Sequence, residues 1–219
     1  MIFTKTCRVC GRELVRGEQK LCLHCDSMIP LWHGSNDDLR AHRLPRNAPI
    51  RGIWPWMMYS NEDPVCALIR VGKFNDRPEL IEELSKRYAG RLIEERITDD
   101  IDFIVPVPMH WWKKLRRGYN QSELIANAIG EAASIPVIKV LKAVRSHSVQ
   151  SRKSGLERAA NVAGIFALNS SNTIAPGAHI AVVDDILTTG ATLSEAINTL
   201  RPLHPKEISV LTLAATKLN

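Results

Sequence analysis

The chain has 219 residues, 45% of them hydrophobic, which suits a folded protein with a substantial core rather than an unstructured one. Its 29 basic and 23 acidic residues give a formal net charge of +6, which favours anionic partners such as phosphorylated metabolites or nucleic acid without choosing between them. No apolar run approaches the ~20 residues that span a bilayer, and MIFTKTCRVC lacks the layout of a signal peptide. We therefore expect a soluble, cytoplasmic protein.

Four of the five cysteines form two Cys-x-x-Cys pairs close to the start of the chain. They are Cys7, Cys10, Cys22 and Cys25. Two such turns present four sulfurs to one tetrahedral Zn²⁺, and a closed four-sulfur site leaves no open position for catalysis. We therefore predict a structural zinc knuckle. Four reduced cysteines without metal and a redox pair are the less favoured alternatives.

The region after the knuckle gives weaker signals. Alternating aromatic residues around Trp54 and Trp56 predict a strand in which these side chains pack. Apolar residues at helical spacing predict helices over Pro64–Val71 and Pro78–Leu92. Between residues 26 and 60, Pro45, Pro49 and Pro55 indicate irregular connections and one or two strands.

The segment Met109–Gln121 is strongly basic and follows a predicted strand over Asp102–Val107. We expect it to be a loop that binds pyrophosphate or phosphate, because Arg116 and Arg117 can fork phosphate oxygens and Gly118 admits the backbone. Two adjacent tryptophans among the basic residues also suit single-stranded nucleic acid, which we rank second. A solvated loop with the tryptophans packed beneath it ranks third.

The stretch VVDDILTTGATL, from residue 182 to 193, carries the main chemical prediction. An apolar strand over Ile180–Val183 leads into two carboxylates, then a turn of small residues, then an apolar helical pattern. The turn and the helix N-terminus suit a phosphate, and the carboxylates suit sugar hydroxyls or a hydrated divalent cation. The alternative is an ordinary capping box formed by Thr192 and Glu195. The residues predicted to hold the sugar phosphate are Asp184, Asp185, Thr188, Thr189, Gly190, Ala191 and Thr192.

This stretch resembles the signature of type I phosphoribosyltransferases that binds 5-phosphoribosyl 1-pyrophosphate (PRPP). Together with the cysteine pairs and the segments VPVPMHWWKKLRRGYNQSELIA and 145–161, it makes the chain resemble the ComF family, which includes ComFC and GntX-like proteins. The resemblance implies PRPP bound with Mg²⁺, and a link to DNA uptake in competence. It implies a mobile loop over bound PRPP, so contacts to pyrophosphate or from this loop are expected from Arg116, Arg117, Gly118, Gln150, Lys153 and Arg158.

Predicted strands near residues 102, 137, 180 and 208 alternate with helices, which indicates an α/β fold with a mostly parallel sheet. The resemblance makes this the type I phosphoribosyltransferase fold. We expect a zinc-binding module over residues 1–33, a connecting, partly helical and hood-like region over 34–98, and a phosphoribosyltransferase-like domain over 99–219.

The predicted function is a PRPP-binding, phosphoribosyltransferase-like protein of competence. PRPP or another phosphorylated ribose is the expected ligand, with single-stranded DNA and DNA-uptake proteins as further partners. We lean towards transfer of the phosphoribosyl group to an unidentified acceptor. We leave the enzyme assignment open, because the sequence shows no base that would activate a nucleophile. The alternatives are a single-stranded nucleic-acid-binding component and a PRPP sensor without chemistry.

Overall fold

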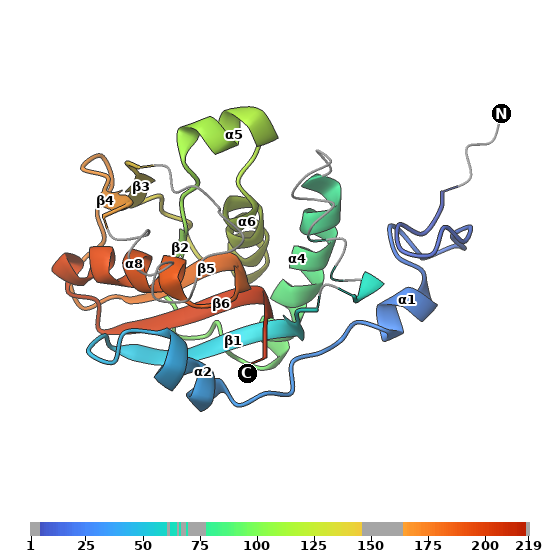
Figure 1. Cartoon of the computed structure of the whole chain (residues 1–219), viewed down its shortest axis with the longest axis horizontal. Coiled ribbons are helices and arrows are strands. Elements are labelled where there is room, and N and C mark those ends of the chain that lie inside the picture. The colour runs from blue at the N-terminus through green and yellow to red at the C-terminus, as the bar shows by residue number, and fades with distance from the viewer. Residues whose placement is uncertain are drawn as a thin grey trace.

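The computed structural model describes residues 5–60, 62–64, 66, 69, 78–145 and 164–217. Its centre is a four-stranded sheet of β1 (Ile50–Met58), β6 (Glu207–Ala215), β5 (His179–Leu187) and β2 (Phe103–Pro106), in that order (Figure 1). All neighbouring strands pair in parallel, as the alternation of strands and helices predicted. The carboxyl ends of these strands therefore lie at one edge of the sheet, where open α/β sheets bind ligands.

Helices cover both faces of the sheet (Figure 1). One face packs against α4 (Pro78–Glu94) and α6 (Gln121–Ala133), and the other against α2 (Asn36–Arg43) and α8 (Ala191–Leu200). The helix predicted over Pro78–Leu92 is therefore confirmed, with two further residues at its end.

Strand β5 shows why the sheet needs both layers. Ala181 and Val183 belong to the core under α4 and α6, whereas Ile180 and Val182 belong to the core under α2 and α8. Successive side chains of a strand point to opposite faces, so an unbroken apolar run is buried only when both faces are covered. The strand predicted near residue 208 is β6, and all its residues after Glu207 are buried. Both faces of β6 are therefore covered as well.

The strand predicted near residue 137, over Pro136–Leu141, does not form one continuous element. Ile104 donates its N–H to Pro136 O and accepts from Ile138 N, which places a single parallel bridge beside β2. The next rung on this edge would need an N–H from Pro106, and proline has none. The chain then leaves β2, and β3 (Leu141–Ala143) pairs antiparallel with β4 (Phe166–Leu168) in a separate small sheet.

The cysteine-rich N-terminal segment packs beside α4 (Figure 1). It contains the short helix α1 (Leu23–Ser27), and Asp26 of that helix forms an ion pair with Arg87 of α4. The chain then pairs antiparallel with the outer edge of β1, at Leu31 and Met57. Among the described residues, no helix has the length and apolar character needed to cross a membrane.

Two other sequence predictions concern the strand around Trp54 and the helix over Pro64–Val71. Trp54 and Trp56 lie in β1, as predicted, and Trp56 stacks on Tyr88 with ring centroids 6.1 Å apart. Of the helix predicted over Pro64–Val71, only residues 64, 66 and 69 are described, and each is helical.

Candidate functional site

The paired carboxylates lie within β5 rather than after it. The strand predicted to end at Val183 continues to Leu187, because the backbone pairing with β6 runs on through Asp184, which faces Thr212. Asp184 is half-buried, and Asp185 is 8% exposed. The acids therefore sit on a rigid, hydrogen-bonded strand at the carboxyl end of the sheet.

Local hydrogen bonds orient both carboxylates. Asp184 Oδ1 accepts from Ser122 Oγ and from the N–H of Asp185, each at 2.9 Å. Asp185 Oδ1 accepts from the N–H of Ile186 at 2.8 Å. Ser122 lies in the first turn of α6, whose N-cap is the buried Asn120, so α6 fixes its own start against the acid pair.

The turn after β5 begins a helix without a side-chain cap. Thr188 and Thr189 are exposed, and Gly190 is the N-cap of α8 with φ of 78°. A glycine cannot satisfy the first N–H groups of the helix with a side chain, so these donors and the positive end of the helix dipole suit an anion.

The alternative prediction of a capping box is wrong. Thr192 is not the N-cap, because α8 already begins at Ala191. Glu195 Oε1 instead accepts from the N–H of Gly164 at 2.6 Å, which joins α8 to the start of the chain leading into β4. The turn is thus left without the reciprocal bonds that a capping box would supply.

The basic segment is a helix rather than the predicted loop. It forms α5 (Trp111–Arg117), which has no buried residue and ends at Gly118 in the left-handed conformation with φ of 82°. Helix geometry separates two adjacent arginines: Arg116 is exposed, whereas Arg117 is half-buried. Burial lowers the pKa of Arg117, and the negative charge of Asp185 partly opposes that shift, so Arg117 lies within electrostatic reach of the acid pair.

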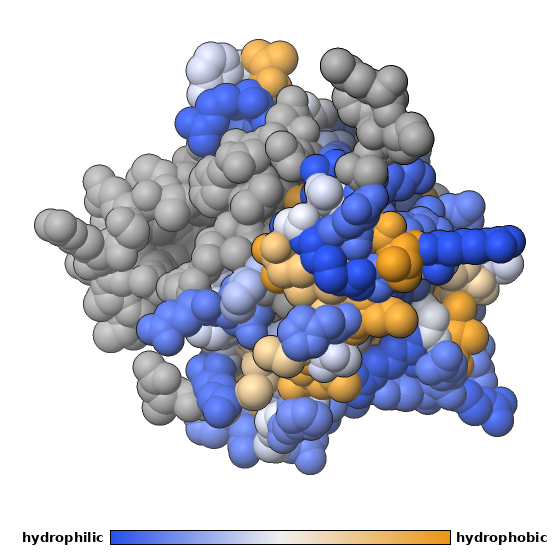
Figure 2. All heavy atoms as spheres, turned by 90° about the vertical axis from the view of Figure 1, so that its right-hand side faces the viewer, coloured by the Kyte–Doolittle hydropathy of each residue, from blue (hydrophilic) through white to orange (hydrophobic). Residues whose placement is uncertain are grey.

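The two tryptophans of α5 are exposed, at 64% for Trp111 and 57% for Trp112. The third-ranked alternative, in which the tryptophans pack beneath a loop, is therefore wrong. Their rings meet edge to face with centroids 5.6 Å apart. Figure 2 shows hydrophilic and hydrophobic side chains together on the projection over α5 at the top of the molecule.

The remaining residues predicted to contact pyrophosphate or to belong to the loop over it are Gln150, Lys153 and Arg158. They lie outside the described residues.

The four paired cysteines converge as predicted. The Sγ atoms of Cys7, Cys10, Cys22 and Cys25 all lie within 4.8 Å of one another. Tetrahedral zinc with Zn–S bonds of about 2.3 Å needs sulfurs about 3.8 Å apart, so a small contraction fits the ion. The N–H of Cys25 donates to Cys22 Sγ at 3.4 Å, and this bond is the main reason that the pKa of the Cys22 thiol falls to about 6. The cluster could therefore hold a metal ion.

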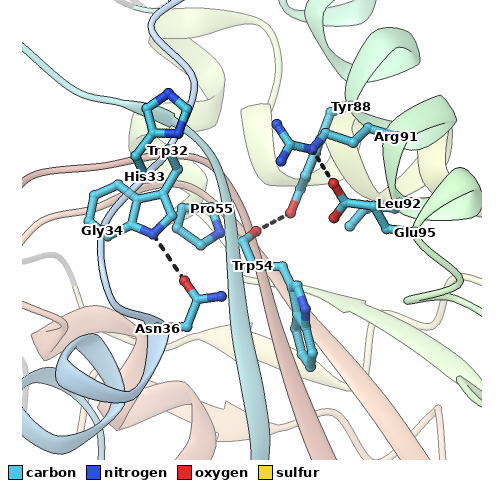
Figure 3. Close-up of a pocket in the computed structure, with 10 residues that line it drawn as sticks. All are labelled: Trp32, His33, Gly34, Asn36, Trp54, Pro55, Tyr88, Arg91, Leu92 and Glu95. Carbon is cyan, nitrogen blue, oxygen red and sulfur yellow. Dashed lines mark hydrogen bonds and ion pairs between the residues drawn. The ribbon is translucent and has the colours of Figure 1, made fainter.

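A cavity of about 200 Å³ lies beside β1, on the edge of the sheet away from β2 (Figure 3). Several of its polar lining groups bond to one another. Trp32 Nε1 donates to Asn36 Oδ1 at 2.9 Å, and Tyr88 donates its hydroxyl to the carbonyl of Trp54. A ligand would have to displace these bonds, so the cavity is a packing feature rather than a second site.

His179 lies at the amino end of β5, opposite the acids, and is 4% exposed. Its Nδ1 is 2.8 Å from the carbonyl of Asp100, which can only accept, so Nδ1 carries the hydrogen. Its Nε2 therefore accepts from Ser209 Oγ at 2.8 Å. Burial lowers the pKa of His179 and keeps the ring neutral, so the residue is structural.

Residues 76–217 match the family model described as the phosphoribosyl transferase domain. This chain therefore belongs to the phosphoribosyltransferase family, and its sheet is the parallel sheet of the type I fold.

Curated relatives narrow the family further. The chain is 31% identical over 223 residues to Competence protein F of Haemophilus influenzae, and the match covers 97% of each chain. It is 27% identical over 197 residues to the DNA utilization protein YhgH of Escherichia coli, covering 86% of this chain and 81% of that one. It is also 26% identical over 202 residues to Competence protein ComFC of Bacillus subtilis, covering 85% and 80%. The predicted resemblance to the ComF family is confirmed.

Proposed function

We propose that this chain binds PRPP at the carboxyl end of β5. The observation that carries the proposal is the start of α8, which is capped only by Gly190. This residue lies three positions after Leu187, where β5 ends, and five positions after Asp185 of the carboxylate pair. In this assignment the turn from Thr188 to Thr192 receives the 5-phosphate, and the two carboxylates accept from the ribose hydroxyls. Membership in the phosphoribosyltransferase family supports the same ligand.

The pyrophosphate of PRPP would lie towards the α5–α6 connection. Arg117 is half-buried within reach of Asp185, so it is the better placed of the two arginines to balance pyrophosphate charge from inside the site. Arg116 would contribute from the exposed side of α5. Mg²⁺ would be held by the pyrophosphate oxygens together with oxygen donors of the acid pair, since it prefers such ligands.

The chemistry that this arrangement supports is transfer of the phosphoribosyl group to an acceptor. The bond from C1 to the leaving oxygen breaks while positive charge develops on the sugar, so the protein must stabilise the departing pyrophosphate and exclude water. A cation at Arg117 would supply the first requirement, while the turn would hold the sugar in place through its 5-phosphate. We therefore propose PRPP binding as the main function, and transfer of the phosphoribosyl group as the reaction that this binding would allow.

Calorimetric titration with Mg²⁺ and PRPP tests the binding proposal. Wild type should bind, and Asp184→Asn combined with Asp185→Asn should abolish binding while keeping the hydrogen bond from Ser122, because an amide oxygen still accepts. Glu131→Gln, an exposed acid on α6, removes the same kind of charge and should bind as wild type does. Wild type that does not bind PRPP would refute the proposal. Pyrophosphate release with a panel of bases and amines then separates a transferase from a sensor.

A second proposal is single-stranded nucleic-acid binding by α5. The exposed indole rings of α5 can stack on bases. The neighbouring basic residues Lys113, Lys114 and Arg116 favour contact with the phosphate backbone of a nucleic acid. The relatives named for competence and for DNA utilization agree with this proposal. Neutralising Lys113, Lys114 and Arg116 should weaken the binding of a labelled oligonucleotide and reduce its salt dependence. Binding that is absent, or independent of salt, would exclude this role.

We propose that the cysteine cluster holds one structural Zn²⁺ and that residues 1–33 form a module around it. The convergence of four sulfurs supports the metal. We further propose that residues 34–98 connect this module to the domain over 99–219 and supply β1 and α4 to its layers. A cytoplasmic location, where thiols stay reduced, fits free cysteines in a metal-binding arrangement.

A further inference from the structure

Arg43, the last residue of α2, reaches the end of β5 from far away in the sequence. It is 9% exposed. Its Nη1 donates to the carbonyl of Leu187 at 3.1 Å, and its Nη2 donates to the carbonyl of Lys217 at 2.8 Å. Leu187 is the last residue of β5, so the guanidinium holds the chain one residue before the turn begins.

The backbone of the same residue touches the other side of the turn. Ser194 Oγ, in the first turn of α8, donates to Arg43 O at 3.1 Å. A Cβ added to Gly190 would lie 2.0 Å from Arg43 O and 2.8 Å from Arg43 Cβ. One residue of α2 therefore contacts the strand end, the turn glycine and the helix start, which leaves the turn little freedom to rearrange.

The charge of Arg43 is the second observation. Its two hydrogen-bond acceptors are backbone carbonyls, and in the described part of the chain no ion pair includes it. Burial is the cause that lowers the pKa of this guanidinium. A buried cation balanced by carbonyl dipoles alone is unfavourable, and an anion bound at the adjacent turn would offset that cost.

We propose that Arg43 is a positioning residue of the anion-binding turn. It holds this turn open for a phosphomonoester, and its buried charge favours a negatively charged ligand there. The proposal rests on the function proposed above and extends it to a residue outside the signature. Arg43 acts through the carbonyl of Leu187, the backbone at Gly190 and the hydroxyl of Ser194, not by touching the ligand.

The test compares two anions by calorimetry, ribose 5-phosphate and pyrophosphate with Mg²⁺. In Arg43→Gln the affinity for ribose 5-phosphate should fall about tenfold, in line with the loss of charge-assisted hydrogen bonds, while the affinity for pyrophosphate stays within about twofold. Arg43→Lys keeps the charge but not the fork, so it should recover part of the loss. Arg40→Gln removes an exposed charge from the same helix and should change neither affinity.

Each outcome decides between a specific role and a merely structural one. Equal weakening of both anions in Arg43→Gln, or no change in ribose 5-phosphate affinity, would overturn the proposal. If Arg43→Gln does not fold, Ser194→Ala breaks the backbone contact and keeps the charge, and an unchanged preference between the two anions in this variant would count against the proposal. A wild type that binds neither anion would instead refute the proposed function, and the role of Arg43 with it.

Discussion

Replacing Gly190 with alanine should be one of the most damaging single-methyl changes in this protein. The residue has φ of 78°, and the new Cβ would lie 2.0 Å from the carbonyl oxygen of Arg43, a backbone atom that cannot rotate away. The left-handed conformation costs an alanine about 1–2 kcal/mol. Relieving a backbone clash in a packed region adds about 1–3 kcal/mol.

The reduced entropy of the unfolded chain returns about 0.4–1 kcal/mol. The net loss is therefore about 1–5 kcal/mol, with a middle value of about 3 kcal/mol, which in a domain of this size lowers the melting temperature by about 6–12 °C. Binding of ribose 5-phosphate should be lost as well, because α2 and α8 can only separate by distorting the turn.

Gly177→Ala is the matched control. Gly177 has nearly the same φ, 83°, but its added Cβ meets nothing within 4 Å. Only the conformational cost remains, and the same entropy gain offsets part of it, so its melting temperature should fall by at most about 6 °C and ribose 5-phosphate should still bind. Calorimetric unfolding and titration of both variants give the comparison. Equal melting temperatures, together with full binding by Gly190→Ala, would refute the packing of Arg43 against the turn.

Three further predictions concern the rest of the chain. Purified protein should carry about one zinc per chain, and Cys22→Ser or a strong chelator should lower its melting temperature; metal-free protein of unchanged stability would exclude the zinc site. The lowered pKa of His179 means that the unfolded chain takes up a proton first, so stability should decrease as the pH falls below about 6.5, and urea titrations should show a flatter decrease for His179→Gln. A wild-type stability that does not change between neutral pH and about pH 5 would contradict the buried neutral ring. Trp111→Ala with Trp112→Ala should leave the melting temperature within about 2 °C, since both rings are exposed, but should weaken oligonucleotide binding; a large loss of stability would show that the rings pack.

Local patterns in the sequence were sufficient to predict the framework of the site. The apolar run into Asp184 and Asp185, followed by small residues and a helical repeat, predicted the strand, the turn and the helix in the correct order. Backbone pairing decides where a strand ends, and that pairing depends on the neighbour. The continuation of β5 through both acids therefore follows from the equal length of β6, which the signature does not contain.

The contacts that shape the turn were not predictable from the signature. Arg43 belongs to a region where the sequence indicated only irregular connections, and its role depends on a tertiary contact between α2 and α8. Glu195 shows the opposite case. A local capping pattern with Thr192 was present in the sequence, but the Glu195 carboxylate instead accepts a hydrogen bond from the distant N–H of Gly164. The end of the bridge after Val137 was readable in principle, since Pro106 cannot donate to a further rung.

The most direct measurement is a crystal structure of this chain, determined from crystals soaked with ribose 5-phosphate. We expect the phosphate at the turn from Thr188 to Thr192, within hydrogen-bonding distance of the backbone N–H groups that begin α8, and the ribose hydroxyls on Asp184 and Asp185. A sugar phosphate bound elsewhere, or a turn closed by its own side chains with the carboxylates directed away from the ligand, would contradict the central claim.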